Sequence, residues 1–255
     1  MPLQPGIIYG PVRSRRLGLS LGVNLLPSRY KLCSFNCLYC QYGWTRQPTI
    51  VPTHQLKDLP SPSEVVAALE KALQALSKEG PTINSITICG NGEPTLYPEL
   101  RQVVEAAKRL RDRYVPKVRL SIFSNSSTVG NKQVRETLEL LDLKIMKFDA
   151  GSEELISKLN HPACPIYIGE IVAGLQKLTD VLLASLFVQG RATNADPDSV
   201  SLWIEKVRDI RPTVVQVYTL DRPPADSKIE KVNLPTLQWI AEQVRFQAGL
   251  PAEVY

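Results

Sequence analysis

The sequence predicts an α/β fold, namely an incomplete (βα)6 barrel with parallel strands inside and helices outside. One observation is that short β-branched runs alternate with amphipathic stretches along all 255 residues, which is the pattern of repeated βα units. The other is that polar residues and glycines follow the strands, where barrels of this kind gather their functional loops. We expect a single domain over residues 1–255, with a core at roughly 14–225 and a C-terminal helix at roughly 235–248.

The elements are expected in an order that suits such a barrel. The first strand, at 17–26, ends at Pro27, and an irregular loop rich in polar, aromatic and cysteine residues follows it. The first helix starts at the capping box Ser61-Pro62-Ser63-Glu64 and stops at Gly80-Pro81. The later elements are strand 85–89, helix 97–114, strand 118–123, helix 132–141, strand 143–150, helices 152–159 and 167–178, strand 181–188, helix 196–210, strand 214–220 and helix 235–248.

Charge and hydropathy limit where the protein works. The formal net charge of +5 is mild for this length, so the composition permits an anionic partner without requiring one. The N-terminus lacks the apolar run of roughly 7–15 residues that a signal peptide has. The rest of the sequence contains no apolar stretch of roughly 18 residues. We therefore expect a cytoplasmic, monomeric protein without a membrane segment.

Cysteines give the strongest chemical signal. Three of the five, Cys33, Cys37 and Cys40, lie within eight residues, which is too close for a secreted disulfide framework. Clustered thiolates select iron–sulfur clusters, zinc or copper(I) over hard cations. A structural zinc site needs four ligands, and neither His54 nor His161 is an obvious fourth one. A four-iron cluster on three cysteines leaves one iron open to an external molecule, so the missing ligand favours that alternative.

The cysteine spacing also resembles a known signature. Cys33-x3-Cys37-x2-Cys40, with Tyr39 before the last cysteine, resembles the motif of the radical S-adenosylmethionine (radical SAM) superfamily. Further along, Gly90-Asn91-Gly92-Glu93-Pro94 resembles the glycine-glycine-glutamate-proline motif of that superfamily, with one residue inserted between the glycines. The two motifs occur in the order that the superfamily shows, and the resemblance covers roughly residues 10–225.

The resemblance implies the cofactors and the type of chemistry. It implies a [4Fe–4S] cluster on the three cysteines, with S-adenosylmethionine bound to the open iron. Reductive cleavage of S-adenosylmethionine then yields a 5′-deoxyadenosyl radical, which abstracts a hydrogen from the substrate. The electron comes from an external reductant such as flavodoxin or ferredoxin. Because the sequence holds no further cysteine cluster, we expect one cluster only.

The resemblance further implies which residues contact S-adenosylmethionine. The segment Gly90 to Pro94 is expected at the methionine group, since glycines allow a close approach of the backbone; the alternative is that it only shapes a turn. Tyr39 is expected near the adenine, or else as an aromatic residue buried beside the cluster. Ser124, Asn125 and Asp149 end strands where the superfamily places polar groups for the ribose and the methionine carboxylate, although helix caps and turns also use these residues. We assign no catalytic residue.

The substrate is defined less well than the cofactors. The opening residues, 10–12 and 14–18, resemble a subgroup of iron–sulfur oxidoreductases related to the tRNA wyosine-forming enzymes, which suggests a tRNA base or a small molecule. Arg13, Arg15 and Arg16 suit a phosphate-bearing substrate. The alternative is an activase that generates a glycyl radical on a partner protein. A non-catalytic metal-binding module ranks last, because it needs neither the glycine motif nor a barrel.

Some conspicuous residues receive structural interpretations or none. The basic run at 108–119 is interpreted as an exposed helix face that favours solubility. Cys89 is expected in the core as a small apolar residue. Cys164 and His161 have no assigned role, and Gln216 and Tyr218 on the last strand are weaker candidates than the other strand-end residues.

Overall fold

The computed structural model describes residues 1–46, 48–49 and 58–255, so the prediction about His54 lies outside the described residues. Its main element is an eight-stranded sheet in the order β1-β2-β3-β4-β5-β6-β8-β10, and β7 and β9 form a separate two-stranded ribbon. The strands span Ile8–Ser14 (β1), Gly18–Val23 (β2), Ser85–Ile88 (β3), Arg119–Ser124 (β4), Leu143–Lys147 (β5), Val181–Leu186 (β6), Val188–Gly190 (β7), Val214–Tyr218 (β8), Ile229–Lys231 (β9) and Ala252–Val254 (β10).

The central strands confirm the predicted incomplete barrel. From β2 through β6 to β8, each strand pairs in parallel with the next. The edges of the sheet are β1, which pairs antiparallel with β2, and β10, which pairs parallel with β8. The barrel is therefore open between β1 and β10. The sequence did not predict these edge strands, because Pro11 interrupts the pattern of β1 and β10 has only three residues.

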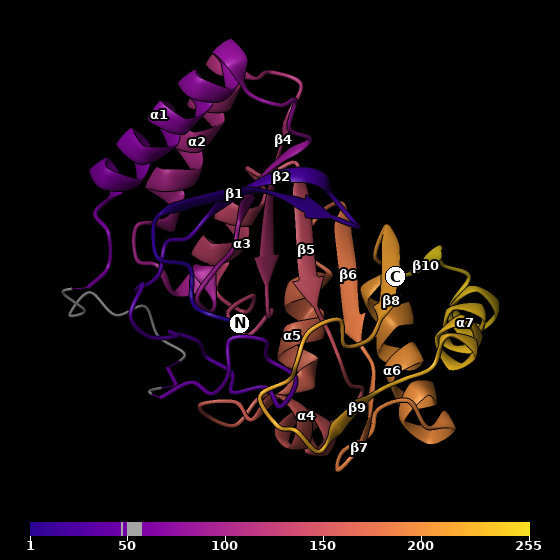
Figure 1. Ribbon diagram of the computed structural model, residues 1–255. Coiled ribbons are helices and arrows are strands. Elements are labelled where there is room, and N and C mark those ends of the chain that lie inside the picture. Colours follow the sequence, from indigo (N-terminus) through magenta and orange to yellow (C-terminus); the bar gives the residue numbers. More distant parts are fainter. Residues whose placement is uncertain (47, 50–57) are drawn as a thin grey trace.

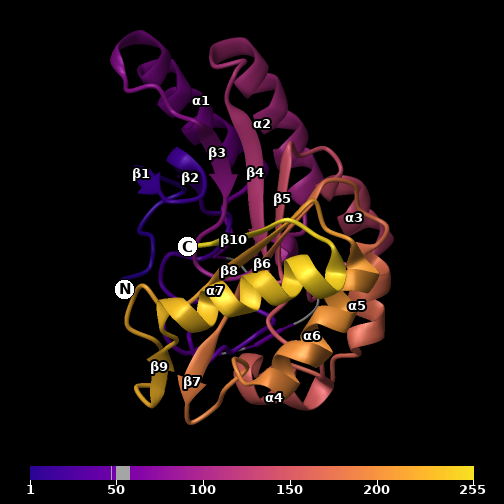
Figure 2. The same cartoon turned by 90° about the vertical axis from the view of Figure 1, so that its right-hand side faces the viewer.

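Helices cover the outer side of the sheet (Figures 1 and 2). They span Pro62–Glu79 (α1), Leu100–Tyr114 (α2), Lys132–Leu138 (α3), Glu153–Asn160 (α4), Ile168–Leu175 (α5), Pro197–Ile210 (α6) and Leu234–Gln243 (α7), with short turns at Pro94–Leu96 (η1) and Val244–Ala248 (η2). The predicted capping box of α1 is confirmed, since Ser61 and Glu64 exchange hydrogen bonds through their side chains and backbone. The second helix starts at Leu100 rather than at 97, because Tyr97 ends η1 and residues 98–99 form a turn. Within the described ranges, no helix is both long and apolar enough to cross a membrane.

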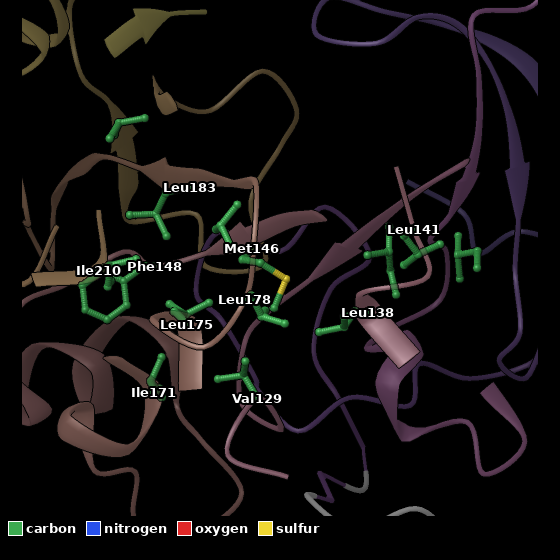
Figure 3. Close-up of a cluster of buried hydrophobic side chains, with 14 of the residues drawn as sticks. Val129, Leu138, Leu141, Met146, Phe148, Ile171, Leu175, Leu178, Leu183 and Ile210 are labelled. Carbon is green, nitrogen blue, oxygen red and sulfur yellow. The ribbon is translucent and has the colours of Figure 1, made fainter. Parts of the chain in front are cut away.

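The outward face of the sheet forms the main hydrophobic core. Alternate residues of the strands, such as Met146 of β5 and Leu183 of β6, are completely buried there. Figure 3 shows both among side chains from the covering segments, including Leu175 of α5 and Ile210 of α6. This packing fixes the strands and thereby the positions of the loops at their carboxyl ends.

The inward face lines the barrel interior and is partly polar. The hydroxyl groups of Ser20, Ser85, Thr87 and Ser121 form a connected set across β2, β3 and β4, with oxygen–oxygen distances of 2.6–3.1 Å. Lys147 is the last residue of β5, and its side chain points to the inward face, opposite in direction to that of the buried Met146. An interior with this many polar groups is suited to a polar ligand.

Arg111 lies inward from α2, although we expected the basic run around it to be exposed. Its Nη1 lies 2.5 Å from Asp142 Oδ2 and 2.9 Å from the Val118 carbonyl oxygen, and its side chain is only 9% exposed. Asp142 in turn accepts a hydrogen bond from the Leu120 amide at the start of β4. The arginine therefore ties α2 to the sheet.

Arg111→Met is expected to lower the free energy of unfolding by about 2 kcal/mol, because it leaves Asp142 without its cation. We place the loss below that of a fully buried pair, since the Asp142 side chain is 35% exposed. Urea denaturation measures the effect. Arg101→Met is the matched control: Arg101 pairs with Glu105 on the exposed face of the same helix, and its loss should cost less than about 0.5 kcal/mol. Equal losses in the two variants would contradict this assignment.

Candidate active site

The cysteine loop lies at the carboxyl end of the barrel strands and is hydrogen-bonded to the glycine motif. Leu32, just before the first cysteine, forms a parallel bridge with Gly92. Its amide donates to the Asn91 carbonyl oxygen, and its own carbonyl oxygen accepts from the Glu93 amide, each at 3.0 Å. Figure 1 shows this segment, which follows β2, at the end of the molecule toward which the arrowheads of β5 and β6 point. The two sequence motifs are thus brought together, as predicted.

Gly92 is required by this contact. A Cβ atom at Gly92 would lie 1.6 Å from the Leu32 carbonyl oxygen, and the φ angle of +143° is one that other residues rarely adopt. At Gly90, a Cβ atom would lie 2.4 Å from Asn24 Oδ1. Asn91 lies between them with a buried side chain that donates to the Gln4 and Pro27 carbonyl oxygens. The inserted residue therefore fastens the N-terminal segment to the motif.

A second segment, 159–163, holds the other side of the cysteine loop. The amides of Asn36 and Leu38 donate to the carbonyl oxygens of Asn160 and Leu159, at 2.8 and 2.9 Å. The Ala163 amide donates to the Ser34 carbonyl oxygen at 2.8 Å. His161 ends α4 with a left-handed backbone and takes part through its carbonyl oxygen rather than its ring. The loop is therefore held between the end of β3 and the end of α4.

Cys33 and Cys37 lie in an environment that disfavours their thiolates unless a cation is present. Burial, and then the neighbouring Cys40, raise the pKa of the Cys37 thiol to about 11. Burial and the Cys37 thiol likewise raise the pKa of Cys33. The Phe35 backbone amide and Lys31 oppose this shift at Cys33, and Asn160 Nδ2, 3.4 Å from Cys37 Sγ, opposes it at Cys37. Asn125 Nδ2 also lies 3.6 Å from Cys33 Sγ. Such donors stabilise negative charge on sulfur.

Glu93 connects the ends of β3 and β4. Its buried carboxylate accepts hydrogen bonds from the Thr95 amide and hydroxyl, from Ser124 Oγ at 2.9 Å and from the Asn125 amide at 2.6 Å. Burial raises the pKa of Glu93, and these four donors act in the opposite direction. The Asn125 side chain also donates to Ser34 Oγ at 2.8 Å. Ser124 and Asn125 thus lie at the site, with Ser124 bonded to Glu93.

Asp149 connects the cysteine loop to β5 and β6. Its Oδ2 accepts from the Tyr39 hydroxyl and from Asn160 Nδ2. Its Oδ1 lies 3.0 Å from Lys147 Nζ and 2.9 Å from the Leu186 amide. Burial raises the pKa of Tyr39, and the Asp149 carboxylate adds to that effect. Tyr39 is therefore a protonated phenol held in one orientation beside Cys40.

Sequence reasoning missed Asn160 and Lys147. Asn160 reads as the last residue of a helix, and its contact with Cys37 joins residues 123 positions apart. Lys147 gave a signal that was not used, since it is one of two lysines, with Lys144, in a short strand whose other residues are apolar. Burial lowers its pKa, but Asp149 and Tyr218 outweigh burial and raise the pKa overall. Cys89, which we expected in the core, is only half-buried, and its Sγ lies 2.8 Å from the Tyr9 hydroxyl.

Comparison with known families identifies this combination of fold and motifs. The family model described as the radical SAM superfamily matches residues 28–182, which is more than half of the chain and includes both motifs. The chain therefore belongs to the radical SAM superfamily. It is an enzyme of the class that uses a [4Fe–4S] cluster and S-adenosylmethionine, as predicted, and members of this class need a one-electron reductant.

Individual relatives agree with the family. UPF0026 protein MJ1312 of Methanocaldococcus jannaschii is 30% identical over 228 residues, covering 88% of this chain and 66% of that protein. The chain thus spans slightly less than two thirds of this relative. A radical SAM methyltransferase from Sphaerobacter thermophilus superimposes with a TM-score of 0.67 at 17% identity, covering 92% of this chain and 65% of that one. TYW1 with a lysine–pyruvate adduct gives 0.64 at 14% identity, covering 90% and 74%. These two structures share the fold.

The predicted ligands fit an iron–sulfur cluster. The three thiols lie in one loop, the pKa values of Cys33 and Cys37 are raised, and amide donors lie at both of these sulfurs. Such a site suits thiolates whose charge is balanced by a bound cationic group. In the described part of the chain, no three His, Cys, Asp or Glu side chains are arranged around the position of one metal ion. A four-iron cluster does not require its cysteines to converge on one point, because each thiolate binds a different iron atom.

Asn160→Leu is expected to lower the reduction potential of the cluster by roughly 60 mV, a tenfold change in a one-electron equilibrium. The amide hydrogen bond to Cys37 stabilises the reduced cluster, which carries more negative charge, so its removal makes reduction harder. An EPR-monitored redox titration measures the midpoint. Gln189→Leu, on the exposed ribbon strand β7, removes an amide far from any cysteine in the sequence and should leave the potential unchanged. An unchanged midpoint in Asn160→Leu would contradict the expected role.

Proposed function

We propose that the chain cleaves S-adenosylmethionine at a cluster held by Cys33, Cys37 and Cys40 and then removes a hydrogen atom from a substrate in the barrel. The observation that carries this proposal is the bridge between Leu32 and Gly92, which joins the cysteine loop to the glycine motif at the carboxyl end of the strands. When bound, the two cofactors supply a 5′-deoxyadenosyl radical. The remaining task of the protein is to hold them and to shelter the radical.

In this proposal, the backbone of Gly90 to Glu93 forms the wall against which the methionine group of S-adenosylmethionine lies. Pro94 opens η1 and directs the chain away after Glu93. Asn125 lies between Ser34 and Cys33, so it is placed to contact both the cluster loop and the bound cofactor. Asp149 acts by orienting Tyr39, which we place beside the adenine.

For the substrate, we propose a base in tRNA. The support is the resemblance of residues 10–12 and 14–18 to the subgroup related to wyosine-forming enzymes, together with the shared fold of TYW1. The net charge of +5 and the exposed Arg13 and Arg15 agree with a polyanionic partner. A partner protein that receives a glycyl radical is the alternative outcome of the test below.

The first experiment tests the cofactor chemistry. After anaerobic reconstitution with iron and sulfide, the protein is reduced with dithionite and given S-adenosylmethionine. Release of 5′-deoxyadenosine, measured by mass spectrometry, supports the proposal. A protein that binds stoichiometric zinc and does not cleave S-adenosylmethionine would overturn the proposal.

The second experiment tests the substrate. Deuterium-labelled tRNA and deuterium-labelled protein from the same cells are supplied separately, and the 5′-deoxyadenosine is analysed for deuterium. Label from tRNA supports a tRNA substrate. Label from the protein fraction favours the activase, and label from neither rejects both macromolecules.

A further inference from the structure

One basic residue near the N-terminus points into the barrel rather than into solvent. The turn between β1 and β2 is fixed by Ser14 Oγ, which accepts hydrogen bonds from the Arg16 and Leu17 amides at 3.3 and 3.2 Å. Leu17 is buried against Ile145 of β5 and Ala184 of β6, which lie on the inward face of the sheet. The turn therefore closes the barrel at the amino ends of the strands and carries Arg16 inside.

Arg16 is held there by aromatic rings and one amide. Its guanidinium carbon lies 4.4 Å from the centre of the Tyr218 ring and 5.2 Å from that of Phe123. Its Nη1 lies 3.4 Å from Gln216 Oε1, a long hydrogen bond. These cation–π contacts hold the guanidinium against two aromatic rings and leave N–H donors available for ligands.

The charge of Arg16 is not balanced by a carboxylate in the part of the chain that the structure describes. The ion pairs of those residues include Arg15 with Asp221, but none involves Arg16. Tyr255 lies within electrostatic reach of Arg16, yet its hydroxyl donates to Glu253. A guanidinium has five N–H donors, and the hydrogen bond to Gln216 uses one of them. A half-buried cation with free donors is suited to bind an anion.

A chain of contacts links this arginine to the cysteine loop. The Tyr218 hydroxyl accepts a hydrogen bond from Lys147 Nζ at 2.8 Å, and Lys147 is paired with Asp149. Asp149 in turn accepts from Tyr39, beside Cys40. The charge of Lys147 is thus already paired, whereas that of Arg16, which contacts the same Tyr218 ring, is not. The net charge of this inward cluster is positive.

We propose that Arg16, Gln216 and Tyr218 form a subsite that binds an oxyanion of the substrate, either a carboxylate or a phosphate. This rests on the proposed function, because it assigns to the same barrel interior the group that anchors the substrate. Arg16 supplies the charge and a pair of parallel donors, Gln216 supplies an amide, and the Tyr218 ring holds the guanidinium by a cation–π contact. The alternative is that these three side chains only fill the barrel interior by packing against one another, and in that case no anion binds there.

The test measures binding of two probes, inorganic phosphate and acetate, by isothermal titration at low ionic strength. The reconstituted protein is first saturated with S-adenosylmethionine, so that neither probe binds the open iron. We expect at least one probe to bind, and Arg16→Gln to weaken that binding by about tenfold or more. Tighter binding of phosphate indicates a phosphate-bearing substrate, and tighter binding of acetate indicates a carboxylate-bearing one.

Arg101→Gln is the matched control, because Arg101 lies exposed on the outer face of α2, where it pairs with Glu105, and its loss should not alter binding. Arg16→Lys keeps the charge but not the planar fork, and we expect it to bind several-fold more weakly than the wild type; it also serves if Arg16→Gln does not fold. Binding of neither probe, or equal binding in the wild type and the Arg16 variants, overturns the subsite. A wild type that binds an anion but releases no 5′-deoxyadenosine would instead overturn the proposed function and leave the subsite standing.

Discussion

Cys37→Ala is expected to abolish retention of the iron–sulfur cluster and to lower 5′-deoxyadenosine release by more than about 100-fold. Loss of partners that only support ligands already costs about 10–100-fold in metal affinity or activity, so loss of a ligand should cost more. A three-cysteine site has no spare thiolate. Cys37 is also the most enclosed of the three, at 9% exposure, and it is flanked by Asn160. Iron analysis, visible absorbance and product quantification after anaerobic reconstitution measure the result.

Cys164→Ala is the matched control for this experiment. Cys164 is a half-buried cysteine outside both motifs, so its replacement should leave iron content and cleavage at wild-type levels. Iron retention and cleavage that survive Cys37→Ala would refute the ligand assignment. Equal losses in the two variants would point to a general requirement for thiols during reconstitution instead.

Gly92→Ala has the second largest expected effect. The new Cβ atom would lie 1.6 Å from the Leu32 carbonyl oxygen and 2.5 Å from its carbonyl carbon, so the backbone before Cys33 must move. We expect a loss of roughly 3 kcal/mol in the free energy of unfolding, from strain at a positive φ angle and from overpacking. A displacement of about 1 Å at a reacting centre costs about 100-fold in rate, so cleavage should fall by a similar factor.

Urea denaturation and product quantification check both parts of this prediction. Gly169→Ala is the matched control, because a Cβ atom there meets nothing within 4 Å. It should change stability by less than about 1 kcal/mol and leave cleavage unchanged. If Gly92→Ala behaves like Gly169→Ala, the Leu32–Gly92 bridge does not hold the cysteine loop in place.

The fold was predictable where local patterns were strong. Helical periodicity with a capping box placed α1 to within a residue or two, and β-branched runs such as 85–89 placed the buried parallel strands. The edge strands β1 and β10 have no such pattern, because each is paired on one side only and one of them contains a proline. Their positions follow from tertiary pairing, which a single-sequence pattern does not encode.

The candidate site was predictable where spacing carried the chemistry. The cysteines and the glycine motif could be named from the sequence, whereas the partners of strand-end residues could not. Ser124 was expected at the cofactor or as a cap or turn residue, and its hydroxyl donates to Glu93 and accepts from the Ser126 amide. Arg16 looked equivalent to Arg13, yet one lies between aromatic rings inside the barrel and the other is exposed. Side-chain direction at a turn depends on packing against distant strands.

The two-sided anchoring of the cysteine loop also sets the order in which the enzyme matures. The loop is fastened by Asn160, and the Leu38 carbonyl oxygen accepts a hydrogen bond from the Asp226 amide, so its partners emerge from the ribosome long after the cysteines do. Contacts that join distant parts of a chain form late, because closing the intervening loop costs entropy before the contact is gained. We therefore expect stable cluster binding only after α4, which carries Asn160, has packed against the loop. A chain truncated before α4 lacks Asn160 and the carbonyl partners of Asn36 and Leu38, so its three thiols should be more accessible to oxidation and to competing metals.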